Sequence, residues 1–114
     1  MGTYRDLIIF QKADELAFQI YNITRSFPKE ERYGITSQIR RSALSVSANI
    51  VEGHARRTKK EFRQFINIAI GSLAETKYFF EFSKKLGYHK KEYPETSQLI
   101  EETSKTLWSF YRTL

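Results

Sequence analysis

Hydrophobic residues recur along most of the chain at the three- and four-residue intervals that place side chains on one face of an α-helix. This spacing predicts four helices, over about residues 6–25, from within 29–36 to 52, over 58–86 and over 94–114. The alternating pattern of a half-buried strand is scarce. We therefore expect an all-α protein.

Glycine, proline and capping residues mark the predicted helix boundaries. Gly53 and Gly87 follow the second and third helices, where glycine readily takes the left-handed conformation that ends many helices. Thr58 and Glu61 have the spacing of a capping box, which predicts the start of the third helix. Pro94 suits the first turn of the fourth helix, because its missing N–H is not needed there.

Short connections between the four predicted helices indicate an antiparallel up-down-up-down four-helix bundle, formed by a single domain over residues 1–114. The two middle helices, however, each carry two apolar faces, which one chain cannot easily cover. In the second helix these faces are Ile39, Ala43, Val46 and Ile50, and Leu44, Ala48 and Val51. In the third they are Phe62, Ile66, Ala69, Leu73 and Phe80, and Ile68, Phe79, Phe82 and Leu86.

Uncovered apolar faces of this kind predict that the protein forms a homo-oligomer. Small residues would let helices of neighbouring subunits approach closely, namely Ser42, Ala43, Ser45, Ser47, Ala48, Gly71 and Ser72. The alternative is that the two middle helices are simply the central pair of a compact bundle.

A polar stripe separates the two apolar faces of the second helix and consists of Gln38, Arg41, Ser45, Asn49 and Glu52. Each of these side chains can reach the next along the helix. We interpret the stripe as a structural hydrogen-bonded network rather than a catalytic site, because enclosed polar groups are generally paired. If the stripe is enclosed, Arg41 of a neighbouring helix or subunit, or a backbone amide, is the expected partner of Glu52.

The net charge of +6 is concentrated in one part of the chain. Residues 37–67 include seven basic and two acidic side chains, whereas the rest is almost balanced. The connection between the second and third helices lies here, beside free helix amides that favour anions. We predict that its cations bind the phosphates of RNA or DNA without reading bases, through Arg56, Arg57, Lys59, Lys60 and Arg63. The alternative is a solvated, flexible loop.

No other pattern indicates catalysis, a metal or a cofactor. The chain has no cysteine, no phosphate loop following a strand, and no Glu-x-x-His pair of the kind that binds metals in helical bundles. His54 and His89 are isolated in sequence, and we expect them to be solvated. Because these motifs are missing, we expect a protein that is not an enzyme. No apolar run is long enough to cross a membrane, so we expect the protein to be cytoplasmic. Tyr33, Tyr88 and Tyr93, in connections, are the candidates for stacking on a single strand.

Three segments of the sequence are distinctive: Thr-Ser-Gln-Ile-Arg-Arg at 36–41, Ala-Asn-Ile-Val-Glu-Gly at 48–53 and Gly-Ser-Leu-Ala-Glu at 71–75. Together with Phe-Gln-Lys-Ala at 10–13 and Phe-Pro-Lys at 27–29, they resemble the four-helix bundle proteins encoded in intervening sequences of bacterial large-subunit ribosomal RNA genes. The resemblance spans nearly the whole chain.

This resemblance implies a four-helix bundle that assembles as a ring-shaped homopentamer. It also implies a relation to the accessory protein of diversity-generating retroelements, which binds nucleic acid and its reverse transcriptase through a basic surface. Two hypotheses follow. The first is a non-catalytic oligomer that binds structured RNA or an RNA–DNA hybrid through its basic connection. The second is a protein-interaction scaffold whose basic face docks an acidic partner protein.

Overall fold

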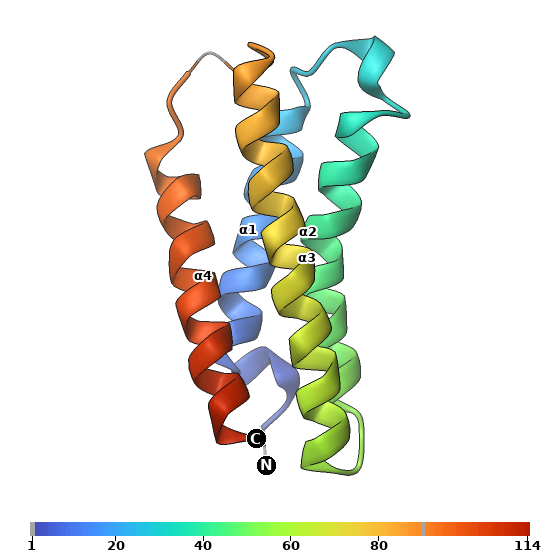
Figure 1. Ribbon diagram of the computed structural model, residues 1–114, viewed down its shortest axis with the longest axis vertical. Coiled ribbons are helices and arrows are strands. Elements are labelled where there is room, and N and C mark those ends of the chain that lie inside the picture. Colours follow the sequence, from blue (N-terminus) through green and yellow to red (C-terminus); the bar gives the residue numbers. More distant parts are fainter. Residues whose placement is uncertain (1, 90) are drawn as a thin grey trace.

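Four helices make up the computed structural model, which describes residues 2–89 and 91–114 (Figure 1). They are α1 (Ile8–Thr24), α2 (Ile35–His54), α3 (Lys59–Lys85) and α4 (Pro94–Thr113), with short 3-10 turns η1 (Tyr4–Asp6) and η2 (Lys29–Glu31) before α1 and α2. The described residues contain no strand, so the all-α class and the four predicted helices are confirmed. None of the described helices is long and apolar enough to span a membrane.

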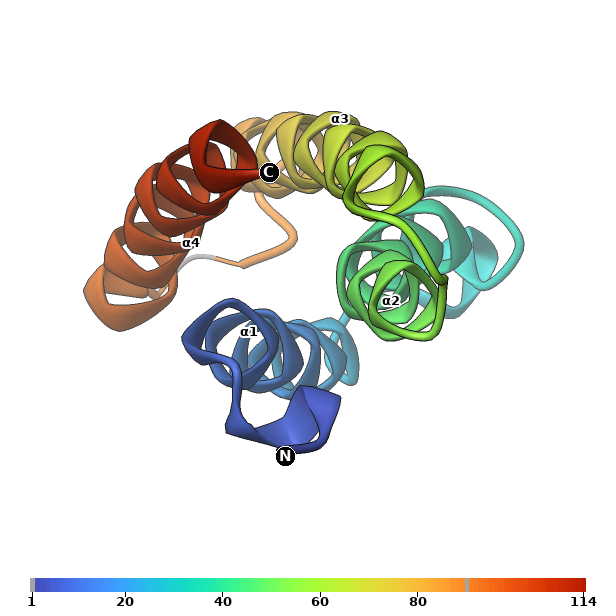
Figure 2. The same cartoon turned by 90° about the horizontal axis from the view of Figure 1, so that it is seen from below.

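The α2–α3 connection lies at the same end of the molecule as η1 and the end of α4, at the bottom of Figure 1. We call this end, defined by residues 55–58, the turn end. The α1–α2 and α3–α4 connections lie at the opposite end, along a molecule that is 43 Å in its longest dimension (Figure 1). Viewed along its length, the molecule shows the helices in the order α1, α2, α3, α4 around the core (Figure 2).

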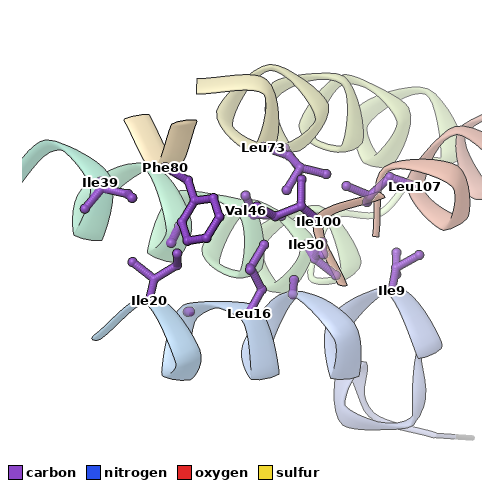
Figure 3. Packing of buried hydrophobic residues seen from close by; sticks show 14 of the residues in the cluster. Ile9, Leu16, Ile20, Ile39, Val46, Ile50, Leu73, Phe80, Ile100 and Leu107 are labelled. Atoms are coloured by element: carbon purple, nitrogen blue, oxygen red, sulfur yellow. The ribbon is translucent and has the colours of Figure 1, made fainter. Parts of the chain in front are cut away.

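The core is built from one face of each helix, and its large side chains point toward a common centre (Figure 3). On α2 the core face is the predicted apolar face that begins with Ile39, and on α3 it is the predicted face that begins with Phe62. Phe62 itself is only half-buried. The buried members of these two faces are each no more than 5% exposed: Ile39, Ala43, Val46, Ile50, Ile66, Ala69, Leu73 and Phe80. Burial of large apolar side chains contributes roughly 1.5–3 kcal/mol each, so these positions dominate the stability of the bundle.

Small polar residues hold α2 against α3. Thr76 Oγ1 donates a hydrogen bond to the Ser42 hydroxyl at 2.9 Å, and the Ser45 and Ser72 hydroxyls lie 2.9 Å apart. Asn49 Nδ2 donates to the Ser45 hydroxyl at 3.0 Å and so extends this contact along α2. Such distances require the two backbones to approach closely, which larger side chains would prevent. These serines therefore join two helices of one chain, and our expectation that they serve contacts between subunits is corrected.

The start of α1 differs from the predicted boundary by two residues. Asp6, which we placed in the first helix, belongs instead to η1, because its carboxylate accepts the backbone N–H of Thr3 at 3.0 Å. The Thr3 hydroxyl in turn accepts the N–H of Arg5 at 3.2 Å. This local capping makes a separate turn before the helix begins at Ile8.

The end of α2 also differs from the prediction. The helix continues through Gly53 to His54, and Gly53 has no left-handed conformation. Among the described residues only Gly87, after α3, has a positive φ (81°), as expected for a helix end. A Cβ atom on Gly53 would lie 2.8 Å from both Phe62 Cδ1 and Phe65 Cβ of α3. Gly53 is therefore required for helix packing rather than for ending the helix.

Two ion pairs connect α4 to its neighbours. Lys12 Nζ of α1 lies 3.2 Å from Glu102 Oε1, and Lys77 Nζ of α3 lies 2.8 Å from Glu101 Oε1. These hydrogen bonds from lysine lower the pKa of both glutamates below 4.5. The same interaction raises the pKa of Lys77. The Lys77–Glu101 pair is exposed and the Lys12–Glu102 pair is half-buried, so solvent screens both and each contributes little to stability.

We expect Gly53→Ala to destabilise the protein, although alanine is by about 1 kcal/mol the better helix former. The added methyl group must displace Phe62 or Phe65, at a cost of typically 1–3 kcal/mol for an overpacked site. The matched control is Gly71→Ala in α3, where a Cβ would meet nothing within 4 Å. Urea unfolding should show a loss of stability for the first variant and no loss for the second. An equal or greater stability of Gly53→Ala would contradict the packing role.

We also expect the α4 ion pairs to be lost on acidification. Because the pKa values of Glu101 and Glu102 are lowered on folding, their contribution to the free energy of unfolding is present above pH 4.5 and disappears as the pH falls through the lowered values. The measurement is urea unfolding of the wild type and of E101Q/E102Q at about pH 7 and about pH 3. The stability difference between the two proteins should shrink at the lower pH, and a constant difference would refute the assignment.

Candidate nucleic-acid interface

Thr58 fixes the geometry of the α2–α3 connection. Its hydroxyl accepts the backbone N–H of Glu61 at 3.1 Å and donates to the Glu61 carboxylate at 3.0 Å. The predicted cap is confirmed, although the Glu61 carboxylate bonds to the hydroxyl rather than to the Thr58 backbone. The connection between the end of α2 and Thr58 is consequently short. The side chains on either side of it lie at the turn end.

The five predicted phosphate-binding side chains are all exposed but differ in their contacts. Arg56 donates to Glu52 at 2.8 Å and lies 4.9 Å from the centroid of the Phe65 ring, so its charge is already compensated. Arg63 lies over Tyr111 of α4, 4.6 Å from the ring centroid. Among the described residues, no ion pair is formed by Arg57, Lys59 or Lys60. These three, with Arg63, form the accessible positive surface.

Sequence analysis missed two further cations that belong to elements at the turn end. Arg5 lies in η1, which packs against α2, with its guanidinium 4.8 Å from the centroid of the Tyr4 ring. Arg112 lies in the last turn of α4, which also ends here (Figure 1). Both are remote from the connection in sequence. The signal that could have found them is the predicted up-down-up-down topology, which places the start of the first helix and the end of the fourth beside the α2–α3 connection.

The members of the predicted polar stripe have different environments. Ser45 and Asn49 are half-buried and take part in the contact between α2 and α3. Gln38, Arg41 and Glu52 are exposed. Glu52 pairs with Arg56, four residues later in the α2–α3 connection, rather than with Arg41. The stripe therefore does not form one enclosed cluster.

The second apolar faces of the middle helices are only partly covered in the single chain, where Val51 and Phe79 are half-buried. On α3 and at its C-cap, Ile68, Phe82 and Leu86 are 50%, 39% and 44% exposed. On α2, Leu44 is 46% exposed and lies beside Phe18 of α1, with which it lines an open hollow. Large apolar side chains left exposed in this way make both surfaces candidates for contacts with another molecule.

His89 is buried, which corrects our expectation that it is solvated. It is 4% exposed, and its ring lies 4.7 Å from the ring of Phe80, centroid to centroid, in a stacked arrangement. Its Nε2 lies 3.0 Å from the Phe80 carbonyl oxygen. His54 is half-buried and meets Phe62 edge-on. Across the described residues, no group of three His, Cys, Asp or Glu side chains could hold a metal ion.

The three tyrosines proposed for stacking lie in different environments. Tyr88 donates its hydroxyl to Glu31 at 2.6 Å, a hydrogen bond that raises the pKa of the phenol. Tyr93 packs edge-on against His89. Tyr33 is 87% exposed but belongs to the α1–α2 connection, at the opposite end from the basic cluster. Three other aromatic side chains are exposed although their sequence positions did not suggest it: Phe18 of α1, Tyr78 of α3 and Trp108 of α4.

These features define an all-α protein whose capped helical turn presents uncompensated positive charge at one end. A family model described as 23S rRNA-intervening sequence protein matches residues 5–109, and the chain belongs to this family. The family resemblance of the sequence is thereby confirmed. No curated protein matches the chain.

A solved structure with the same fold is that of a protein of unknown function from the S23 ribosomal protein family of Bacteroides thetaiotaomicron VPI-5482. The two chains share 27% sequence identity and superpose with a TM-score of 0.82. The similarity covers 91% of this chain and 98% of the other. Neither this description nor that of the family names a catalysed reaction.

Proposed function

We propose that this up-down-up-down bundle is a non-catalytic, oligomeric accessory protein that binds nucleic acid through the turn end. The observation that carries the proposal is the group Arg57, Lys59 and Lys60, which are exposed and form no ion pair among the described residues. Arg63 extends this group along α3. Cations whose charge no carboxylate neutralises are free to replace the counterions of a phosphate backbone.

The local structure supports binding of phosphate rather than recognition of bases. Arg57, Lys59 and Lys60 flank the start of α3, where the first backbone amides of a helix and its dipole favour an anion. Thr58 holds this start in place, so the cations are attached to a rigid element. The family to which the chain belongs takes its name from an intervening sequence of 23S rRNA. We therefore expect structured RNA or an RNA–DNA hybrid as the class of ligand.

Self-association is the second part of the proposal. The exposed apolar residues of α3 and those shared by α1 and α2 form two different surfaces. Helices α1 and α3 lie on opposite sides of the molecule in Figure 2. Two dissimilar surfaces on opposite sides suit head-to-tail contacts, which close into a ring when the rotation between subunits permits. The family resemblance implies five subunits, and a ring would present several turn ends to one nucleic acid.

We expect R57Q/K59Q/K60Q to weaken binding to a structured RNA by on the order of tenfold or more at low salt. The slope of log K against log salt should fall by roughly two to three, because up to three phosphate contacts are lost. The matched control is K29Q/K85Q/K91Q, which removes the same charge at the opposite end. Fluorescence anisotropy between about 50 and 200 mM salt measures both quantities.

An equal loss of RNA affinity in the two triple variants would contradict a binding site at the turn end. Absence of binding by the wild type at low salt would refute the nucleic-acid proposal itself. In that case, a pull-down of an acidic protein that survives nuclease treatment would support the scaffold hypothesis.

Light scattering should give the wild type a mass that is a multiple of 13.5 kDa, fivefold for the expected ring. We expect I68E/F82E to reduce this mass to that of the monomer while circular dichroism remains helical, because a charge on α3 cannot be buried unpaired between subunits. Ile8→Glu is the control, since Ile8 is 57% exposed but lies outside both proposed surfaces. A wild type of 13.5 kDa at micromolar concentration would disprove self-association.

A further inference from the structure

Trp108 is the one tryptophan of the sequence, and its side chain is 42% exposed on α4. Its closest aromatic neighbour is Tyr111, whose ring lies 5.8 Å away, centroid to centroid, in an edge-to-face arrangement. A tryptophan is the largest apolar side chain, and exposing it to water forgoes a large burial energy. The position therefore differs from those of the aromatic residues that fill the core.

A chain of contacts connects Trp108 to Arg63, one of the accessible cations near the turn end. Tyr111 is in contact with Trp108 on one side, and the Arg63 guanidinium lies 4.6 Å from its ring centroid. Arg63 follows Lys59 and Lys60 by one turn of α3. Trp108 is thus separated from the nearest cation of α3 by a single side chain, that of Tyr111.

The immediate surroundings of Trp108 are polar and positively charged. It lines a shallow, open hollow on the surface of α4 together with Ser104, Lys105, Ser109 and Arg112. Lys105 lies near Glu101 and Glu102 and helps to lower their pKa, whereas Arg112 forms no ion pair among the described residues. Hydroxyls and cations around one aromatic ring match a nucleotide, which combines a π-face with hydrogen-bonding groups and a phosphate.

The apolar surfaces proposed for self-association lie elsewhere, on α3 and on α1 with α2. Trp108 has no other large exposed apolar side chain in its hollow. An apolar protein surface would leave the two serines and two cations of this hollow without partners, at a cost for each desolvated group. The composition of the hollow thus favours a nucleotide over a protein partner.

We propose that Trp108 is a stacking platform for an unpaired base, so that the ligand of the turn end includes a single-stranded segment rather than a continuous duplex. This inference rests on the proposed function, because the cations of the turn end guide the strand to the platform. Stacking on an aromatic side chain accepts any base, since every base has a π-face. Arg63 and Arg112 hold the phosphates on either side of the stacked nucleotide.

The sole tryptophan makes the test direct, because fluorescence excited at the red edge of the absorption band, where the seven tyrosines do not absorb, reports on Trp108 alone. The probes are one single-stranded RNA of mixed sequence and the duplex formed with its complement. The single strand should quench the fluorescence and the duplex should not. Trp108→Leu should lose on the order of tenfold in affinity for the single strand and keep its affinity for the duplex. Trp108→Phe, which retains an aromatic face, should lose less.

The possible failures are distinguishable. If both probes bind with equal affinity and leave the fluorescence unchanged, the proposed function stands and the stacking platform is refuted. If Trp108→Leu lowers the affinity for both probes equally, the residue has no preference for unpaired bases and the inference is again overturned. If neither probe binds at low salt, the proposed function fails, and this inference fails with it. The exposed position of Trp108 means that the variants should fold, which circular dichroism verifies.

Discussion

Ser42 and Ser45 of α2 meet Thr76 and Ser72 of α3 at hydrogen-bonding distance, and the other features of the structure depend on this close approach. It is possible only because the contact positions carry hydroxyls, small side chains or, at Gly53, no side chain at all. Close pairing directs the first apolar faces of both helices into the core. It also leaves the second faces on the outside, where only another molecule can cover them.

The pairing of α2 with α3 also keeps the positively charged surface apart from the apolar surfaces. Positive charge collects where α2 passes into α3, because the connection is short and Thr58 starts the next helix at once. Apolar side chains remain on the flanks of the bundle, at Phe18 and Leu44 and along α3. A protein with charge at one end and apolar flanks can associate side by side without covering its charged end. The two parts of the proposed function therefore do not compete for the same surface.

Features that depend on local chemistry could be predicted from the sequence. The cap at Thr58, the left-handed Gly87 and the start of α4 at Pro94 each follow from a few neighbouring residues. Gly53 was misinterpreted because its role depends on two phenylalanines of another helix. His89 was misplaced for the same reason, since its partners Phe80 and Phe27 come from α3 and the α1–α2 connection. For the candidate site, the cluster around the connection was visible in sequence, whereas Arg5, Arg112 and Trp108 join it only through the packing of η1 and α4.

The short connection between α2 and α3 also has a consequence for the order in which the chain folds. Closing a loop costs less entropy when fewer residues separate its ends, and contacts close in sequence form fastest. Loop entropy and contact density therefore favour the α2–α3 hairpin, the most extensively packed pair of helices, as the pair that forms first. On this pathway the capped basic turn is complete before the rest of the bundle closes. A nascent chain would then carry its positive surface while it is still folding, among the polyanions of the cell.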